Sequence, residues 1–355
     1  MELEFGVETF GDVLRTTDEP RETYAQALRH VVEQGVLADA VNIDFFGIGE
    51  HHRWEYAASA PEIPATAIAA RTRHIHVGTA VTVLSSDDPI RVFQRFASLD
   101  GISEGRAEVI LGRGSFTESF PLFGYDLRDY EKLFEEKLEI FALARKQRPF
   151  SWSGSTRDPL QDQQVFPLVE DGLLTTWVGV GGSPESVVRA ARHGFRLMLA
   201  LIGGSPSRFR PYVNLFHQAS DKFGQARQPV GMHSIGHIAD TDEQAREAFW
   251  PALREMAERI GKLRGFPPMT RADYERYIGP SGAMAVGSPE TVAQKIARNV
   301  RLLGIDRFDL KYGNGGIPHA DLMHAIELYG SKVIPRVREL LAAEPSTDER
   351  AHQGL

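Results

Sequence analysis

Cysteine is absent from all 355 residues of the chain. Disulfides, thiolate metal sites, cysteine-ligated clusters and cysteine nucleophiles are therefore excluded. No apolar run approaches the roughly 20 residues that a membrane-spanning helix requires, so we expect no membrane association. Positive charge is also scarce, since 40 basic against 48 acidic residues give a net charge of −8. This balance, without any block of Lys and Arg, argues against a nucleic-acid partner.

The amino terminus gives an indication of location. Residues 1–10 are acidic and begin directly with an apolar alternation. They lack the charged and apolar regions of a signal peptide, and we therefore expect a soluble, cytoplasmic protein.

Short apolar runs alternate with amphipathic stretches along most of the chain. The strands expected are 3–9, 45–49, 74–84, 106–111, 177–180, 195–202, 230–238 and 307–312. The helices expected are 20–37, 61–73, 89–99, 129–146, 184–193, 206–223, 242–259, 289–303 and 318–341. Strands and helices that alternate in this way indicate parallel βαβ units with right-handed crossovers.

Eight such units predict an α/β fold of the (β/α)₈ TIM-barrel type. The competing fold is an open doubly wound sheet, which usually has a Gly-rich turn directly after its first strand. Residues 10–12 do not form such a turn. We expect one barrel domain over residues 1–345. It has irregular insertions after strand 4 (about 147–176) and after strand 7 (about 261–288), and a polar tail at 346–355 follows.

In a barrel of this type the active site lies at the carboxyl ends of the strands. His51 and His52 follow the second strand and are preceded by Glu50. Adjacent residues on an extended chain point to opposite sides, so the two histidines are not expected to share a metal ion. The better functional interpretation is one imidazole that moves a proton, and the structural alternative is a pair of histidines that hold a loop.

Three further segments stand at strand ends. Small residues at 78–81 would let a flat ligand approach the backbone, although core packing is the favoured explanation from this segment alone. Arg113 between two glycines presents a planar fork that suits an anion. Residues 180–186 combine two glycines with a Ser-Pro helix start, where a phosphate could bind. The tetrapeptide Gly-Ser-Pro-Glu recurs at 287–290, so this last signal is weak by itself.

Taken together and in order, these motifs point to a known family. They read GEHH at 49–52, HVGTAV at 76–81, LDGISEGR at 99–106 and GRG at 112–114. The sequence resembles the bacterial-luciferase-like flavin-dependent monooxygenases over almost its whole length. The resemblance implies a barrel that binds FMN at its carboxyl face, usually as a homodimer.

The resemblance also implies roles for individual residues. His51 matches the family's catalytic histidine. The positions implied to bind the cofactor are Thr79, Ala80, Val81, Gly112, Arg113, Gly181, Gly182, Ser183 and Ser186. The flavin would lie beside Ala80 and Val81, often next to a non-proline cis peptide bond. Gly112 stands where the luciferase itself carries a reactive cysteine, which puts light emission in doubt.

The expected function is therefore an FMN-dependent monooxygenase that uses reduced flavin and O2 to oxygenate a small organic substrate. No nicotinamide fingerprint is present, so reduced FMN is expected from a separate flavin reductase. The alternatives are a coenzyme F420-dependent oxidoreductase of the same fold, a flavin-binding protein without turnover, and a metal-dependent barrel hydrolase centred on His51 and His52. No metal site is predicted, and the substrate is left open.

Overall fold

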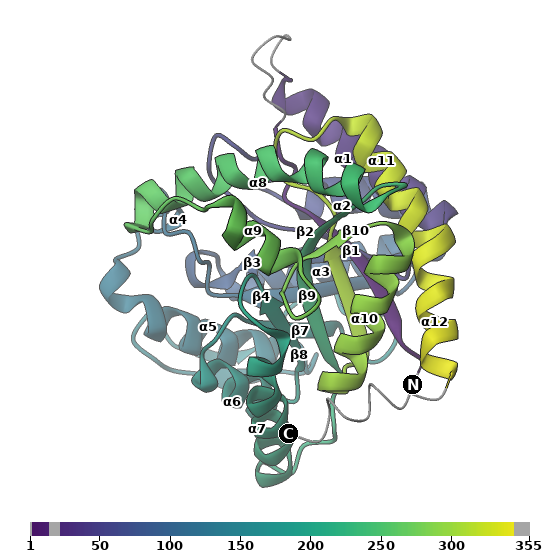
Figure 1. Ribbon diagram of the computed structural model, residues 1–355. Coiled ribbons are helices and arrows are strands. Elements are labelled where there is room, and N and C mark those ends of the chain that lie inside the picture. Colours follow the sequence, from purple (N-terminus) through teal and green to yellow (C-terminus); the bar gives the residue numbers. More distant parts are fainter. Residues whose placement is uncertain (1, 14–21, 344–355) are drawn as a thin grey trace.

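Eight parallel strands form a closed barrel in the computed structural model, which describes residues 2–13 and 22–343 (Figure 1). The barrel strands are β1 (Glu4–Thr9), β2 (Phe45–Ile48), β3 (His76–Val83), β4 (Ala107–Gly112), β7 (Thr175–Val180), β8 (Arg196–Leu201), β9 (Val230–Ile238) and β11 (Arg307–Lys311). Neighbours pair in chain order, and the ring closes because β11 pairs with both β9 and β1. The predicted (β/α)₈ fold is confirmed.

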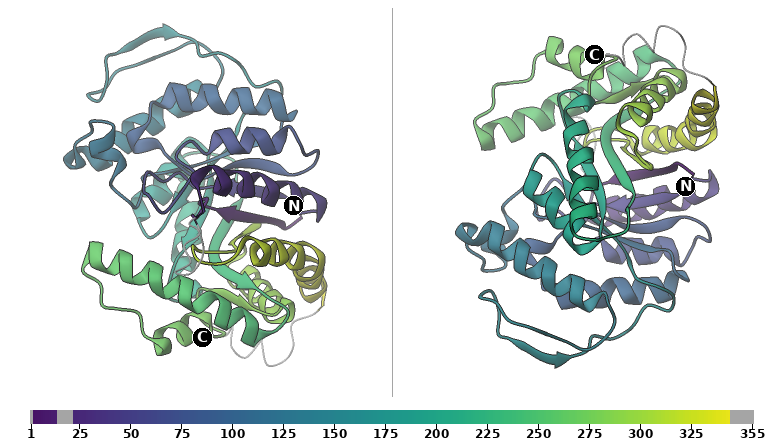
Figure 2. Two further views of the ribbon diagram at one scale, coloured as in Figure 1. Left: turned by 90° about the horizontal axis from the view of Figure 1, so that it is seen from above. Right: turned by 90° about the horizontal axis from the view of Figure 1, so that it is seen from below.

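Helices surround this barrel on the outside (Figure 2). They are α1 (Tyr24–Ala40), α2 (Glu62–Ala69), α3 (Pro89–Ser103), α4 (Ser119–Leu122), α5 (Tyr130–Ala144), α6 (Pro184–His193), α7 (Arg210–Lys222), α8 (Asp242–Arg264), α9 (Arg271–Ile278), α10 (Pro289–Leu303), α11 (His319–Leu328) and α12 (Ile334–Ala342). None of the helices in residues 2–13 and 22–343 combines the length and apolar character needed to cross a bilayer.

Local sequence explains where the most regular helices begin and end. Ser183 caps α6 by accepting a hydrogen bond from the backbone N–H of Ser186, and a proline occupies the next position. The same Ser-Pro start opens α10. A proline at the first helical position has the φ that the helix needs and lacks only an N–H that would be unpaired anyway. The helix α6 ends at Gly194, whose positive φ of 65° costs glycine little.

The two insertions contain regular structure that the sequence did not predict. Within 147–176, strands β5 (Phe150–Trp152) and β6 (Leu160–Gln163) form an antiparallel hairpin outside the barrel (Figure 2). Strands of three and four residues are too short to give a readable alternation, even though Phe150 and Trp152 are buried and Ser151 between them is exposed. Within 261–288, α9 and the strand β10 (Ala285–Gly287) were missed, and α8 extends five residues beyond its predicted end at 259. A capping box at Thr270 explains the start of α9.

The carboxyl-terminal helix differs from the single helix expected over 318–341. A π-helical turn at Tyr329–Val333 separates α11 from α12. The predicted tail at 346–355, and the first residues of the predicted helix at 20–37, lie outside the described residues.

A buried charged group fills the amino-terminal end of the barrel. Arg307 at the start of β11 donates to Glu108 (2.6 Å) and Asp309 (2.9 Å), and its guanidinium lies 3.7 Å from the centroid of the Phe45 ring. Trp177 donates its indole N–H to the same Glu108 carboxylate at 2.8 Å. Because this end is filled, the accessible groups of the barrel interior lie at the opposite, carboxyl end.

Candidate active site

His51 follows β2 at the carboxyl end of the barrel and is enclosed by aromatic rings. Its imidazole stacks on Tyr56, with ring centroids 4.4 Å apart. The edges of Phe10 and Phe116 contact it at centroid distances of 4.5 and 5.2 Å. Among the described residues its ring nitrogens have no hydrogen-bond partner, so aromatic packing orients this ring. Its backbone N–H is held by the carbonyl of Ala58 at 3.1 Å.

The surroundings keep the His51 imidazole neutral. Burial lowers the pKa of His51 to about 3, and the nearby positive charges of Lys311, His52 and Arg53 act in the same direction. Desolvation disfavours the imidazolium because the charged form loses more hydration than the neutral form. At neutral pH one ring nitrogen can therefore donate a hydrogen bond and the other can accept one.

The neighbouring histidine has a different environment. The Nε2 atom of His52 lies 2.8 Å from a carboxylate oxygen of Glu50, and its ring packs edge-on against Phe123. The two rings thus have different contacts, His51 with aromatic side chains and His52 with Glu50. This separation agrees with the expectation that they do not share one ion.

Glu50 connects the loop after β2 to the end of β3. Its backbone N–H donates to the carbonyl of Val81 at 3.0 Å, and its carboxylate accepts from the backbone N–H of Val83 at 2.8 Å. A buried carboxylate that accepts a backbone N–H forms a charge-assisted hydrogen bond, one of the stronger kinds in proteins. Glu50 therefore fixes the segment on which two predicted cofactor residues lie, a role that the sequence motif did not reveal.

The end of β3 has the backbone geometry that the resemblance implied. The peptide bond between Ala80 and Val81 is cis, and the register with β4 shifts at the same point. Ala80 and Val81 both pack with the apolar cluster inside the barrel. Gly112 at the end of β4 lies beside them, because a Cβ placed on it would come within 2.5 Å of Val81 Cγ2. Thr79 is fully buried in the wall, and its hydroxyl pairs with that of Thr82 at 2.8 Å.

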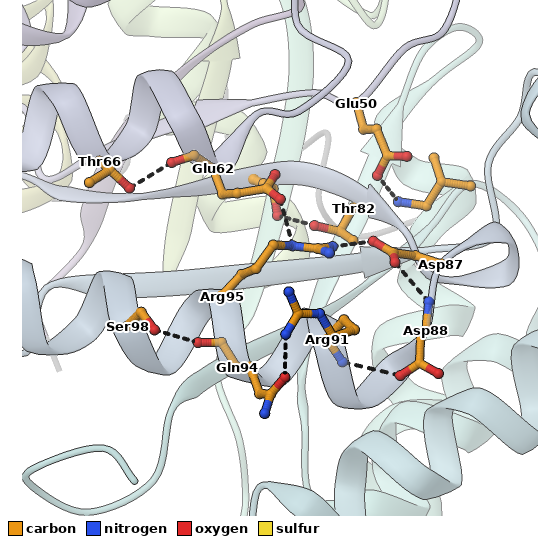
Figure 3. A network of polar contacts seen from close by, with 12 residues as sticks. Glu50, Glu62, Thr66, Thr82, Asp87, Asp88, Arg91, Gln94, Arg95 and Ser98 are labelled. Carbon is orange, nitrogen blue, oxygen red and sulfur yellow. Dashed lines mark hydrogen bonds and ion pairs between the residues drawn. The ribbon is translucent and has the colours of Figure 1, made fainter. Parts of the chain in front are cut away.

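A polar network supports the turn that follows β3 (Figure 3). Arg95 on α3 lies between Glu62 on α2 and Asp87 in the turn, and it forms an ion pair with each carboxylate. Asp88 then caps α3 by accepting from the backbone N–H groups of Ile90 and Arg91. The network ties the turn to two helices, so the segment around Val81 is held from both sides.

Arg113, directly after β4, is brought to the side of the barrel where α6 starts. Its guanidinium pairs with Glu131 on α5 and lies over the ring of Tyr130 at 5.5 Å. Glu131 also contacts Arg189 on α6 at 3.2 Å. The sequence gave no signal for Arg189 or Glu131, because their approach depends on how α5 and α6 pack.

The start of α6 offers open backbone next to this charged group. A Cβ built on Gly181 or Gly182 would meet no atom within 4 Å. The hydroxyl of Ser183 is already engaged, since it caps the helix and donates to Glu185 at 2.8 Å. Ser186 is buried, with 1% of its surface exposed.

The two Gly-Ser-Pro-Glu segments differ in their surroundings. At the start of α10, a Cβ on Gly287 would come within 2.8 Å of Asp242 and Thr291, and Asp242 accepts from the backbone N–H of Ser288 at 2.7 Å. The start of α10 is therefore filled by protein groups, whereas glycines 181 and 182 face open space.

One cluster of histidine and acid lies outside this site. His30 and Glu33 on α1 and His319 on α11 bring potential ligand atoms within 4.8 Å of one another. The two imidazoles are stacked face to face, with centroids 3.8 Å apart and planes at 6°. Ring nitrogens of stacked rings direct their lone pairs within parallel planes, so in this arrangement the pair serves as a contact between α1 and α11.

The chain is similar to known proteins over most of its length. Residues 4–307 match the luciferase-like monooxygenase family. An alkanal monooxygenase alpha chain of Photorhabdus luminescens is 22% identical over 93% of this chain and 97% of its own length. Limonene 1,2-monooxygenase of Rhodococcus erythropolis is 25% identical over 84% of this chain and 78% of its own length.

Solved structures show the same fold at low identity. Monooxygenase RslO1 from Streptomyces bottropensis has a TM-score of 0.81, with 21% identity over 94% of this chain and 99% of its own. The oxygenating constituent of 3,6-diketocamphane monooxygenase from Pseudomonas putida, in complex with FMN, has a TM-score of 0.75 with 19% identity over 95% and 99%. An F420-dependent secondary alcohol dehydrogenase has a TM-score of 0.72, with 19% identity over 95% of this chain and 100% of its own. The match over most of its length shows that this chain belongs to the luciferase-like monooxygenase family.

Proposed function

We propose that this protein is an FMN-dependent monooxygenase that uses reduced flavin and O2 to oxygenate a small organic substrate. The observation that carries the proposal is the grouping of a neutral, accessible His51 with the cis-linked Ala80 and Val81 at one end of the barrel. Gly112, directly beside Val81, adds no side chain of its own. The FMN-bound relative of the same fold supports this choice of cofactor.

The residues present fit FMN at both of its ends. The small side chains of Ala80 and Val81 offer an apolar surface for the flat ring system. Arg113 and the open backbone of Gly181 and Gly182 offer a cation and free peptide groups for the phosphate. Ser183 and Ser186 complete the predicted phosphate positions, and for Thr79 only the backbone is available. When bound, reduced FMN supplies the electrons and the oxygen chemistry, which no side chain of this protein can provide.

The protein's own groups orient and protect the reaction. Phe116 covers one edge of His51 and is itself packed by Arg53 (5.0 Å) and Arg264 (5.3 Å), which helps to exclude water. His51, which is neutral, is placed to donate a hydrogen bond to the substrate or to accept a proton from it. Tyr56 keeps its proton, because burial raises its pKa.

The reductant and the assembly are also part of the proposal. We infer that reduced FMN is delivered by a separate flavin reductase, and that the chain forms a homodimer. The dimer is supported by the surface of α2 and α3, two helices that pack together and expose the apolar side chains of Ile63 (68%) and Ile102 (54%). Light scattering coupled to gel filtration tests the dimer, and a monomer at working concentration would overturn it.

A flavin titration followed by oxygen uptake tests the main proposal. FMN should bind, and its fluorescence should be quenched on binding. When a flavin reductase supplies reduced FMN to the protein in the presence of a panel of organic substrates, oxygen should be consumed and a product should form. Arg113→Ala should weaken FMN by about tenfold or more, since a charge-assisted contact contributes ~1.5–3 kcal/mol. Riboflavin, which lacks the phosphate, should bind both forms equally.

Each alternative has its own outcome. Hydride transfer to coenzyme F420 without oxygen, and no binding of FMN, would identify the deazaflavin enzyme that the F420-dependent relative suggests. Flavin binding without substrate-coupled oxygen uptake across the panel would indicate a flavin-binding protein without turnover. No binding of either cofactor would contradict both enzymatic proposals.

A further inference from the structure

Glu131 occupies the space between two arginines that come from different elements. One carboxylate oxygen pairs with Arg113, in the loop after β4, and the other lies 3.2 Å from Nη1 of Arg189, on α6. The exposed fraction of the side chain is 25% for Arg113, 13% for Arg189 and 56% for Glu131. The two cations therefore face inward, while the carboxylate that joins them is accessible to solvent. We call this group the Arg113–Glu131–Arg189 bridge.

The bridge lies next to the first turn of α6. Nη1 of Arg189 is 3.5 Å from Oγ of Ser186, one of the predicted phosphate positions. The other side of Arg189 is fixed by Glu135, which also pairs with Arg192 at 3.0 Å. Arg189 is thus anchored by one carboxylate and presents its remaining N–H groups to Glu131 and to the helix start.

A carboxylate and a phosphate bind a guanidinium in the same way. Both are planar or tetrahedral oxyanions that accept two parallel N–H bonds. A half-exposed glutamate can turn into solvent at small cost, whereas the arginines that it joins are more deeply placed. The carboxylate of Glu131 therefore fills the position that an incoming phosphate would take between the two arginines.

We propose that Glu131 is a displaceable counter-ion of the flavin phosphate site and that Arg189 is its second phosphate-binding arginine. The inference rests on the proposed function. Glu131 neutralises the arginines when the site is empty. Once displaced, it remains close enough to repel the phosphate dianion and lowers its affinity. FMN is then an exchangeable co-substrate, which suits a protein that receives its flavin already reduced.

The competing role for Glu131 is structural, and it predicts the opposite sign. If the carboxylate mainly holds the two arginines in place for phosphate, its neutral isostere should weaken FMN. If it mainly competes with phosphate, Glu131→Gln should tighten FMN. The sign of the change therefore distinguishes the two roles without a further assumption.

The experiment measures dissociation constants for FMN and riboflavin by fluorescence quenching in the full-length protein. Glu131→Gln should tighten FMN by about three- to tenfold, the range for one partly exposed charge near another, and should leave riboflavin unchanged. Arg189→Ala should weaken FMN by about tenfold and also leave riboflavin unchanged. Arg189→Lys keeps the charge but not the planar fork, so its dissociation constant for FMN should lie between those of the wild type and Arg189→Ala.

Matched controls remove the same charges elsewhere. Glu290→Gln removes a carboxylate from the first turn of α10, where it pairs with Arg336. Arg192→Ala removes an arginine from α6 that pairs with Glu135 and not with Glu131. Both should leave the ratio of the FMN and riboflavin constants unchanged, and melting temperatures should show that every variant is folded.

Several results would overturn the inference. Weaker or unchanged FMN binding in Glu131→Gln would exclude the displaceable counter-ion, and unchanged FMN binding in Arg189→Ala would exclude the second arginine. If the wild type binds flavin, and Glu131→Gln and Arg189→Ala both keep its ratio of FMN to riboflavin dissociation constants, this inference is overturned while the proposed function stands. Absence of flavin binding in every form would overturn the proposed function, and the inference with it.

Discussion

His51 stacks on Tyr56 with ring centroids 4.4 Å apart and planes inclined by 29°. This contact orients the one histidine of the site that is free of a carboxylate partner among the described residues. His52, one residue later, is bound to Glu50 instead. Two adjacent histidines are thus separated into a proton-transfer candidate and a structural group by their neighbours.

Replacement of His51 should lower turnover far more than it weakens flavin binding. The loss of a positioned proton donor or acceptor typically costs 10²–10⁴-fold in rate, so His51→Gln should reduce kcat by about 100-fold or more. FMN affinity should change by no more than about twofold. Steady-state oxygen uptake and a flavin titration measure the two effects. The exposed His324 on α11 provides the control, and a His51→Gln enzyme as active as His324→Gln would remove His51 from the mechanism.

Two partly buried histidines, His51 and His193, should make the fold sensitive to acid. Burial lowers the pKa of His51 to about 3, and burial followed by the charge of Arg192 lowers that of His193 to about 4. In the unfolded chain both titrate near 6.5, so as the pH falls below that value the unfolded state takes up protons that the folded state does not. The stability contribution is complete above pH 6.5 and is lost as the pH falls toward the folded values.

Urea unfolding at pH 7.5 and pH 5 measures this loss. For His51 alone the linkage relation gives a decrease of about 2 kcal/mol between the two pH values. Between the same pH values the free energy of unfolding of His51→Gln should therefore fall by about 2 kcal/mol less than that of the wild type. The difference between the two proteins cancels groups that titrate in both, including His233, whose pKa shifts in the opposite direction. Equal losses in both proteins would mean that His51 is protonated in the folded state.

Arg307 is expected to be essential to stability although it lies far from the site. It is fully buried and pairs with Glu108 and Asp309, so Arg307→Leu leaves two buried carboxylates without their cation. Removing one partner of a buried ion pair costs about 3–5 kcal/mol. Denaturant unfolding should show this loss at pH 7. It should shrink as the pH is lowered, because protonated carboxyls need no cation, and a loss that grows on acidification would contradict the account.

Local rules in the sequence explain much of the barrel. The bounds of β9, α6 and α10 were predicted correctly, and for the two helices the reason is that Ser-Pro starts and Gly ends act within a few residues. The hairpin of β5 and β6 was missed because its strands are only three and four residues long, too short for the buried Phe150 and Trp152 to give a readable alternation. The break between α11 and α12 was missed because a π-helical turn keeps the chain helical, so Gly330 and Pro335 did not indicate a helix end.

The site was predictable in its parts but not in its partners. The resemblance implied roles for His51, Ala80, Val81 and Arg113, and all four lie at or just beyond the carboxyl ends of barrel strands. The sequence could not show that Arg113 pairs with Glu131, because that contact joins a loop to a helix 18 residues away through tertiary packing. Burial first, and then the charge of Lys311 from the far end of the sequence, likewise lower the pKa of His51.

The close approach of Gly112 to Val81 gives the last prediction. A Cβ at position 112 would lie 2.5 Å from Cγ2 of Val81 and 3.0 Å from its Cβ, closer than real Cβ atoms approach. Gly112→Ala should therefore displace Val81, destabilise the protein by about 1–3 kcal/mol and weaken FMN.

The double variant Gly112→Ala with Val81→Ala tests whether that contact is the cause. Val81→Ala removes both Cγ atoms that the new methyl group would meet, so the two changes together should cost less stability than the sum of their separate effects. A thermal or urea double-mutant cycle measures this coupling, which is expected at about 0.5–3 kcal/mol for residues in contact. Gly112→Cys, which restores the thiol position of the luciferase, should carry the same steric penalty as Gly112→Ala and should also be relieved by Val81→Ala. Strictly additive effects would show that position 112 is constrained by something other than Val81.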